Sequence, residues 1–194
     1  MDVITHYDLL IDEGNDPFRD PPELREYMDR WDGPAFLDAM DLCKSKEVLE
    51  IGVGTGRLAC RTAPRCRRLT GIDISPKTIA RAEENLAQYA NIHLICGDFL
   101  TYSFEMQFDV VYASLTLLHF EDKHAFLTKT ASLLRPCGTF VLSIDKNQDK
   151  ILDMGVRKLR IYPDTPERIL PFLGDLCLKE QLETEFAHIL VCTK

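Results

Sequence analysis

The 194-residue sequence lacks the features of a membrane or secreted protein. Its longest apolar stretches, such as Val110–Leu118, are interrupted and much shorter than the roughly 20 apolar residues that a membrane-spanning helix requires. Met1–Asp12 already carries several acidic residues and shows no basic region followed by an apolar one, so no signal peptide is expected. We therefore expect a cytoplasmic protein with no membrane partner.

The sequence also lacks the cysteine spacing of a metal or redox site. Its cysteines stand at positions 43, 60, 66, 96, 137, 177 and 192, and this odd number without close pairs indicates neither a disulfide framework nor a zinc site. The dipeptides Ile95-Cys96 and Val191-Cys192 favour small buried hydrophobic side chains. The five histidines show no metal-ligand spacing either, so no metal is expected.

Basic residues are too few for a nucleic-acid partner. The chain has 23 Lys and Arg against 31 Asp and Glu, a formal net charge of −8, whereas binding to a phosphate backbone needs a basic surface or stripe. The local exception is a cluster of arginines at positions 57, 61, 65, 67 and 68. A solvated helix face and loop is favoured there over an anion site.

The alternation of strand and helix patterns predicts one α/β domain over residues 46–194. Buried strands are predicted at Glu47–Ile51, Leu69–Ile74, Ile92–Cys96, Phe108–Ser114 and Thr139–Asp145, with helices near 57–64, Pro76–Tyr89, Asp122–Leu134 and Pro166–Leu173. Continuous apolar strands favour a doubly wound parallel sheet with helices on both faces. The last two strands, Cys177–Leu182 and Phe186–Cys192, are joined too closely for a helical crossover and should pair antiparallel.

Residues 1–45 are polar, proline-punctuated and of a different character. Helices are predicted at Pro22–Arg30 and Pro34–Cys43, with turns at Asp16-Pro17 and Asp20-Pro21-Pro22. We expect this segment to form a helical lid over the domain that follows.

A glycine-rich turn, VLEIGVGTGRL at residues 48–58, is the strongest signal of function. Gly52, Gly54 and Gly56 follow a buried strand and precede a helix, which allows the backbone to approach a ligand where any Cβ would collide. The start of the helix offers unpaired N–H groups to an anionic group. A ligand site at this turn is therefore predicted.

Three acidic residues stand where an adenosyl cofactor would need hydrogen-bond acceptors. Asp73 ends the second strand 21 residues after Gly52, near the spacing at which an acid meets the ribose in βαβ nucleotide sites. Asp98 ends the third strand and would accept from the exocyclic amine of adenine, while Phe99 or Ile74 packs on the ring. Glu50 would receive the amino end of a methionine moiety, directly or through water.

These residues resemble the motifs of the class I, Rossmann-like methyltransferases that depend on S-adenosyl-L-methionine (SAM). Glu50–Gly56 resembles the ExGxGxG signature, Asp73 the ribose acid, and Gly97-Asp98-Phe99 the adenine-side motif. Phe108–Val111 with Ser114–Phe120 resembles the fourth-strand motif, and Leu133–Gly138 the turn before strand five. The resemblance implies a seven-stranded, mostly parallel sheet with its last strand antiparallel, and SAM as a cofactor that leaves as S-adenosyl-L-homocysteine (SAH).

The resemblance also implies a set of cofactor contacts. His6-Tyr7-Asp8 resembles the Tyr-Asp pair near the start of many small-molecule members, where the aromatic ring covers the cofactor; the alternative is that Tyr7 only packs a helix. The complete predicted set is Tyr7, Glu50, Gly52, Gly54, Thr55, Gly56, Asp73, Ile74, Gly97, Asp98, Phe99 and Ser114.

The sequence carries fewer signals for the residues that would bind the methyl acceptor. His119 lies where the methyl group should emerge and would orient or deprotonate a substrate, unless it is a structural histidine. Trp31 would line the acceptor pocket, unless it belongs to the core. Ser114–Leu117 stands where nucleobase and protein-amide methyltransferases carry Asn/Asp-Pro-Pro-aromatic, and this departure with the acidic balance favours a small-molecule acceptor.

Two other functions are compatible with the pattern. Methyl transfer is an in-line displacement that needs no dedicated triad, so the missing catalytic cluster fits an enzyme but also a catalytically silent SAM binder. An NAD-dependent oxidoreductase shares the glycine turn, but its usual third glycine would fall at Arg57, and no tyrosine has a lysine four residues later. The acceptor, the atom methylated and the oligomeric state stay open.

Overall fold

The computed structural model describes residues 1–194 and contains seven α-helices and nine strands. The helices are α1 (Val3–Asp12), α2 (Pro22–Met28), α3 (Gly33–Ala39), α4 (Ala59–Thr62), α5 (Pro76–Leu86), α6 (Lys123–Leu133) and α7 (Pro166–Ile169), with short 3-10 helices η1 (Ala63–Arg65), η2 (Leu117–His119) and η3 (Leu170–Phe172). The strands are β1 (Glu47–Ile51), β2 (Arg68–Asp73), β3 (Ile92–Cys96), β4 (Phe108–Ala113), β5 (Leu134–Asp145), β6 (Ile151–Asp153), β7 (Lys158–Arg160), β8 (Cys177–Glu183) and β9 (Ala187–Thr193).

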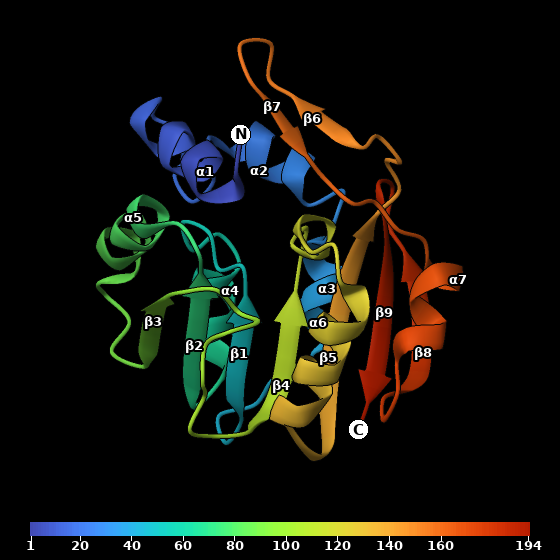
Figure 1. Cartoon of the computed structure of the whole chain (residues 1–194). Coiled ribbons are helices and arrows are strands. Elements are labelled where there is room, and N and C mark those ends of the chain that lie inside the picture. Colours follow the sequence, from blue (N-terminus) through green and yellow to red (C-terminus); the bar gives the residue numbers. More distant parts are fainter.

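Seven strands form one sheet in the order β3-β2-β1-β4-β5-β9-β8 (Figure 1). The first five of these pair in parallel, and β9 runs antiparallel to both β5 and β8. This topology confirms the predicted doubly wound sheet with its C-terminal antiparallel hairpin. The strand order reverses between β1 and β4, and in open α/β sheets the crevice at such a switch point, beyond the carboxyl ends of the strands, is where ligands bind.

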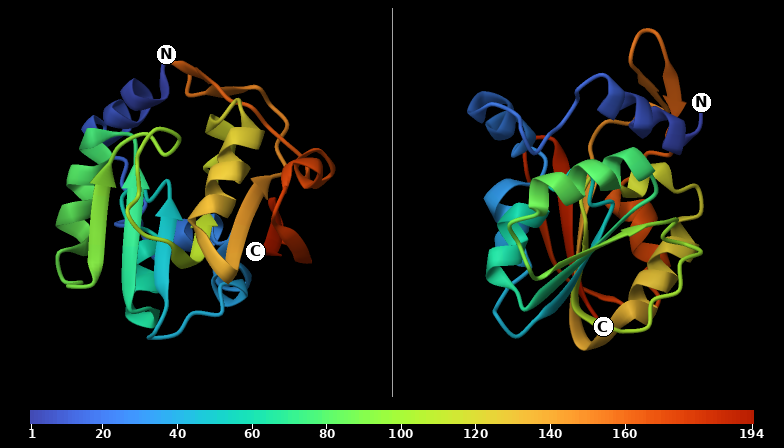
Figure 2. Two further views of the ribbon diagram at one scale, coloured as in Figure 1. Left: turned by 60° about the horizontal axis from the view of Figure 1, so that its bottom comes forward. Right: turned by 90° about the vertical axis from the view of Figure 1, so that its left-hand side faces the viewer.

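Helices cover both faces of the sheet (Figure 2). One core cluster joins α3, α4 and α5 to one face through residues such as Phe36, Ala59 and Leu86. The other joins α6 and α7 to the opposite face through Phe126 and Ile169. Side chains of β1 and β4 are almost completely buried, as the continuous apolar strands predicted.

Local signals explain where the main helices begin. The Ser75 side chain accepts a hydrogen bond from the N–H of Thr78, and Pro76 occupies the first turn of α5. The Asp122 carboxylate caps α6 in the same way through the N–H of Ala125. Asp109, at the start of β4, accepts from the N–H of Glu47 in β1 and pairs with Arg135 in β5, so it connects three strands.

Two elements above the carboxyl edge of the sheet lie outside the predicted set. Helix α1 begins after Asp2, whose side chain accepts from the N–H of Thr5, and a small antiparallel hairpin, β6–β7, follows β5. Figure 1 shows both above the carboxyl ends of the strands, beside α2. None of the helices combines the length and apolarity needed to cross a bilayer.

Polar contacts hold α1 in place from two sides. On the side of α5, Lys77 pairs with Asp12 at 2.6 Å, and the Ser75 hydroxyl donates to the Asp8 carboxylate at 2.6 Å. On the side of the hairpin, the Arg157 guanidinium binds Glu13 in a bidentate pair. Helix α1 therefore bridges α5 and the hairpin.

Two local interpretations of the sequence were partly wrong. Of the arginines after the glycine turn, Arg57, Arg61 and Arg65 pair with acidic residues of the N-terminal segment, whereas Arg67 and Arg68 are exposed as expected. Cys96 is exposed rather than buried, since β3 is the edge strand of the sheet, whereas Cys192 in the interior strand β9 is buried as expected.

Candidate active site

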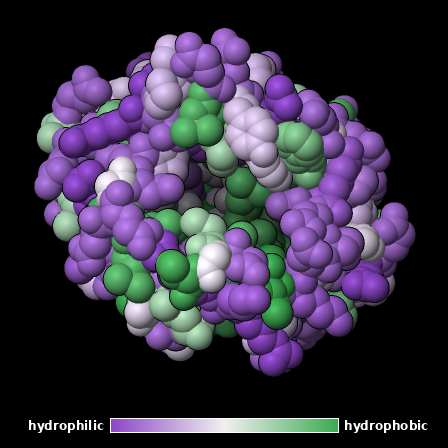
Figure 3. Space-filling view, turned by 90° about the horizontal axis from the view of Figure 1, so that it is seen from above, coloured by the Kyte–Doolittle hydropathy of each residue, from purple (hydrophilic) through white to green (hydrophobic).

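A cavity of about 560 Å³ opens beyond the carboxyl ends of β1, β2 and β4, at the switch point of the sheet. Seen from above, it is a hollow with hydrophobic side chains inside and hydrophilic side chains around it (Figure 3). Twelve of its 26 lining residues are hydrophobic, and the rest include most of the predicted site. Its size is within the range of about 300–1,000 Å³ that small-molecule sites occupy.

The glycine loop, Gly52–Gly56, has the backbone conformation that the sequence predicted. Gly52 has a φ of 76° and Gly54 a φ of 55°, which side chains other than glycine seldom adopt. A Cβ on Gly52 would lie 2.2 Å from Oγ1 of Thr116, whereas a Cβ on Gly54 would meet nothing within 4 Å. Gly52 is thus required by packing, and Gly54 leaves open space on the cavity side.

Asp73 is oriented toward the cavity by two backbone amides. One carboxylate oxygen accepts from the N–H of Gly54 at 3.0 Å and the other from the N–H of Ser75 at 3.0 Å. Burial raises the pKa of this carboxyl group, and the two amides oppose that shift. The free lone pairs of Asp73 are therefore fixed in direction before any ligand arrives, which suits a bidentate contact to ribose hydroxyls.

Glu50 is buried at the base of the cavity. Its Oε2 accepts a 2.6 Å hydrogen bond from the Tyr112 hydroxyl, and its Oε1 makes no hydrogen bond within the protein. Burial raises its pKa to about 8, with a smaller contribution from the nearby carboxylates of Asp32 and Asp73. A ligand ammonium group beside Glu50 would favour the ionised form of this buried side chain.

The third strand supplies the adenine-side residues. Ile74, Gly97, Asp98 and Phe99 all line the cavity. The backbone N–H of Leu100 donates to Oδ1 of Asp98 at 2.8 Å, which leaves Oδ2 without a protein donor. Phe99 is only 3% exposed and packs against Phe126 with 5.2 Å between ring centroids, so it also belongs to the core.

One wall of the cavity is formed by a buried polar network, which we did not predict from the sequence. Asp32, which is completely buried, forms a bidentate pair with the Arg57 guanidinium and accepts from the Ser114 hydroxyl at 2.6 Å. Ser114 and Arg57 line the cavity, and so does Leu115 with a φ of 54°. The only sequence signal was Asp32 before Gly33-Pro34, which also marks a helix N-terminus.

Tyr7 and His119 meet across the cavity although 112 residues separate them. Tyr7 Oη and His119 Nε2 share a hydrogen bond of 2.7 Å, and both residues line the cavity. Burial lowers the pKa of His119 to about 4 and raises that of Tyr7, so both side chains are uncharged at neutral pH. The Nδ1 atom of His119 is buried and has no hydrogen-bond partner in the protein.

Two predicted site residues lie outside the cavity lining. Gly56 does not face the cavity, and a Cβ there would lie 2.7 Å from Leu86, so this glycine allows α5 to pack closely. Trp31 packs on Phe186 with 4.6 Å between ring centroids. Trp31 thus belongs to an aromatic cluster with Tyr27 and Phe186 and is not part of the cavity lining.

Residues 48–138 match a family profile described as a methyltransferase domain. The chain is 34% identical over 104 residues to nodulation protein S of Sinorhizobium fredii. This alignment covers 51% of this chain and 48% of that protein. It is 32% identical over 99 residues to a malonyl-[acyl-carrier protein] O-methyltransferase of Priestia megaterium, covering 50% of this chain and 35% of that enzyme. The chain thus spans about half or less of the length of these curated relatives.

Solved structures share the fold over almost the whole chain. The PH0226 protein of Pyrococcus horikoshii superposes with a TM-score of 0.75 at 19% identity, covering 90% of this chain and 92% of that one. The N-methyltransferase NodS of Bradyrhizobium japonicum, solved with SAH, gives a TM-score of 0.67 at 22% identity, with coverage of 91% and 90%.

These likenesses and the glycine loop define a Rossmann-like methyltransferase domain. The matched residues resemble the methyltransferase-domain family, and the fold of the chain is that of class I SAM-dependent methyltransferases. The profile match supports the predicted methyltransferase resemblance over the oxidoreductase alternative, and two of the solved structures that share the fold were determined with SAH or SAM bound. The individual contacts predicted for the cofactor and the acceptor stay predictions.

Proposed function

We propose that this chain is a SAM-dependent methyltransferase that modifies a small-molecule acceptor in the cytoplasm. The observation that carries the proposal is the cavity at the switch point, where Glu50, Asp73 and Asp98 line one continuous space with the open side of Gly54. All seven cysteines are free thiols, which supports a reducing compartment.

The residues of the cavity fit SAM group by group. Asp73, already fixed by two amides, would accept from the ribose hydroxyls, and Asp98 from adenine between Ile74 and Phe99. The unpaired Oε1 of Glu50 would face the amino group of the methionine moiety. When bound, SAM supplies a methyl group on a sulfonium, which a nucleophile attacks in line with the departing sulfur.

We define the floor of the cavity as the glycine loop and the carboxyl ends of the parallel strands, and its roof as α1 and α2. The acceptor would lie between the floor and the roof. Val3, Tyr7 and Met28 reach the cavity from this roof, and they would exclude water and hold the nucleophile in line with the methyl group. Tyr7 and His119 would contact the acceptor as uncharged hydrogen-bonding groups. We therefore propose residues 46–194 as the SAM-binding domain and the N-terminal segment as its lid.

The size and shape of the site support a small acceptor. The cavity holds about 560 Å³ beneath the roof, and the acidic balance of the chain disfavours nucleic acid. N-methyltransferase NodS and the malonyl-[acyl-carrier protein] O-methyltransferase show that relatives transfer methyl groups to different atoms. The atom methylated by this chain must therefore be inferred from its own cavity.

Calorimetry with SAH tests the cofactor site. Wild-type protein should bind SAH saturably, and Asp73→Asn should weaken binding roughly 10- to 100-fold, the effect of removing a charge-assisted hydrogen-bond pair. Asp175→Asn, a matched change of an exposed residue, should leave the affinity unchanged. Absence of SAH binding by the wild type would overturn the proposal, and unchanged affinity of Asp73→Asn would remove Asp73 from the site.

Methyl-labelled SAM separates an enzyme from a silent binder. Incubation of the protein with labelled SAM and a cell extract should transfer label to a low-molecular-weight product. Tight SAH binding with no labelled product would instead identify a catalytically silent SAM-binding protein.

A further inference from the structure

We propose that the methyl acceptor is an amine that reaches the cavity as a cation, so that the enzyme is an N-methyltransferase; this inference rests on the proposed function. It is carried by the charges that line the cavity. Five acidic side chains line it, those of Glu50, Asp73, Asp98, Glu121 and Asp122, against a single basic side chain, that of Arg57.

The one guanidinium in the lining is not free to bind an anion. Both terminal nitrogens of Arg57 are bound to the two carboxylate oxygens of Asp32, and Asp29 lies 3.8 Å away. A planar guanidinium recognises a carboxylate or phosphate through this same fork, which Asp32 already fills. The only positive side chain of the lining is therefore neutralised inside the protein.

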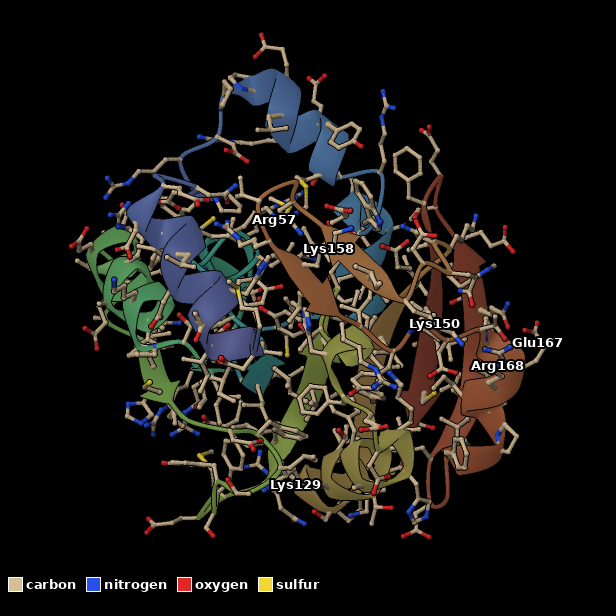
Figure 4. The ribbon with its side chains drawn as sticks, turned by 45° about the horizontal axis from the view of Figure 1, so that its top comes forward. Arg57, Lys129, Lys150, Lys158, Glu167 and Arg168 are labelled. Atoms are coloured by element: carbon tan, nitrogen blue, oxygen red, sulfur yellow. The ribbon has the colours of Figure 1, made fainter.

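Other basic side chains do not reach the cavity. In Figure 4, Lys129 lies on α6, Lys150 and Lys158 at the hairpin, and Arg168 on α7, and none of them belongs to the lining. Lys129 donates to the carbonyl oxygens of Leu100 and Tyr102, and Lys158 pairs with Asp153. An acceptor carboxylate or phosphate would therefore enter an acidic cavity without a partner.

The cofactor does not reverse this balance. SAM carries an ammonium, a sulfonium and a carboxylate, a net charge of +1. Even with Glu50 protonated, as its raised pKa favours at neutral pH, four further acidic side chains line the cavity. Glu50, Asp73 and Asp98 are the residues that fit its polar groups, which leaves Glu121 and Asp122 for the acceptor. The field at the entrance thus favours a cation over an anion.

Glu121 is the most available of these charges. It follows the His119-Phe120 pair in the lining, is exposed to solvent, and makes no hydrogen bond or ion pair within the protein. Asp122, by contrast, uses one carboxylate oxygen to cap α6. A protonated amine would therefore be attracted first by Glu121.

The environment changes from charged to neutral next to Glu121. Tyr7 and His119 are hydrogen-bonded to each other and uncharged at neutral pH, because burial lowers the pKa of His119 to about 4 and raises the pKa of Tyr7. A neutral pair stabilises an uncharged amine better than an ammonium ion, which would be desolvated there. The nitrogen lone pair is then available for attack.

The reaction balances without any further reagent. The ammonium releases one proton to water at the rim, and the nitrogen lone pair forms a bond to the methyl carbon while the carbon–sulfur bond breaks. The bonding pair stays on sulfur, which becomes the neutral thioether of SAH. The positive charge of the sulfonium appears on the methylated nitrogen.

Ion exchange of the acceptor pool tests the inference. A metabolite extract is divided at pH 7 into cationic, neutral and anionic fractions, and each is incubated with the full-length protein and methyl-labelled SAM. The label should enter the cationic fraction as a base-stable N-methyl product. Label in the neutral or anionic fraction, or a base-labile methyl ester, would overturn the inference and leave the proposed function intact. No label from any fraction would overturn the proposed function itself.

A matched pair of variants tests the charge at the rim. With the labelled acceptor in hand, Glu121→Gln should raise its KM roughly three- to tenfold at low salt and leave kcat and SAH affinity within about twofold. Glu105→Gln, the same change at an exposed residue outside the lining, should leave all three unchanged. A lower KM in Glu121→Gln, or no change in KM, would contradict attraction of a cation by Glu121.

Discussion

The floor of the cavity is built from backbone at the carboxyl ends of parallel strands, whereas its roof is held by side chains that are far apart in the sequence. In the floor, the glycine loop continues β1, and its Gly54 N–H is bound to Asp73 at the end of β2. In the roof, Tyr7 contacts His119 and Glu13 contacts Arg157 across 112 and 144 residues.

The two regions also differ in what surrounds their contacts. Val48, Leu49 and Ile51 of β1 are at most 1% exposed, so the floor is fixed by the same packing that stabilises the whole sheet. The Lys77–Asp12 pair of α1 is half-exposed on both sides, and such pairs contribute little to stability. In the Glu13–Arg157 pair the carboxylate is half-exposed and the guanidinium is buried. We infer that the roof can open while the floor stays folded, as entry of an acceptor requires.

The largest effect on stability is expected from a methyl group added to the glycine loop in the floor. Gly52→Ala should lower the free energy of unfolding by about 3 kcal/mol and abolish SAH binding, because the new Cβ meets Thr116 at 2.2 Å and φ is positive. Gly54→Ala has no such contact and should cost only about 1 kcal/mol, yet it should also lose SAH binding because its methyl group occupies cavity space.

Urea denaturation and calorimetry check both variants. Equal stabilities of Gly52→Ala and Gly54→Ala would contradict the packing role of Gly52. Wild-type SAH affinity in Gly54→Ala would show that the cofactor does not approach this part of the loop.

A smaller effect on stability is expected from Glu50, the buried acid at the base of the cavity. The pKa of Glu50 is raised from 4.5 to about 8, so between these values the folded protein keeps a proton that the unfolded chain has released. The stability of the wild type should therefore fall as the pH rises from about 5 to about 8. Glu50→Gln should remove this slope and be about 2 kcal/mol more stable at pH 8, at the cost of weaker SAH binding.

Thermal denaturation of both proteins across this pH range measures the slope. Parallel curves for wild type and Glu50→Gln would show that Glu50 is ionised in the folded protein throughout.

The smallest effect on stability is expected in the roof. Arg157→Gln removes the bidentate contact to Glu13 and should leave Tm and SAH affinity nearly unchanged, while amide exchange in α1 becomes faster. Hydrogen exchange followed by mass spectrometry detects this change. Arg160→Gln, in the strand β7 that directly follows Arg157 but without an ion pair to α1, is the control. A large loss of Tm, or no change in exchange, would contradict a roof held independently of the floor.

The floor was predictable because its signals are local. The glycines, Asp73 and Asp98 lie at the ends of buried strands, and parallel strands bring their carboxyl ends to one edge. The doubly wound sheet and the C-terminal hairpin agree with the predictions for the same reason: each strand carries its own pattern of burial.

The roof was not predictable to the same degree. Helix α1 had a local signal, the Asp2 cap, but its placement depends on contacts to Ser75, Lys77 and Arg157 that no spacing reveals. The strands β6 and β7 have three residues each, too few for an alternating pattern to be recognised. The Asp32–Arg57 pair was missed because either residue alone is compatible with an exposed position.

Asp32 determines how far the N-terminus of the chain can be shortened without disrupting this site. A fragment beginning after residue 32 would retain the glycine loop and every strand, but Arg57 would be left as a charge with only 15% of its side chain exposed and without its carboxylate. Removing one partner of a buried ion pair is far more costly than removing an exposed pair. The boundary of the functional unit therefore lies upstream of the region that the sequence motifs delimit, and expression fragments should begin before α3.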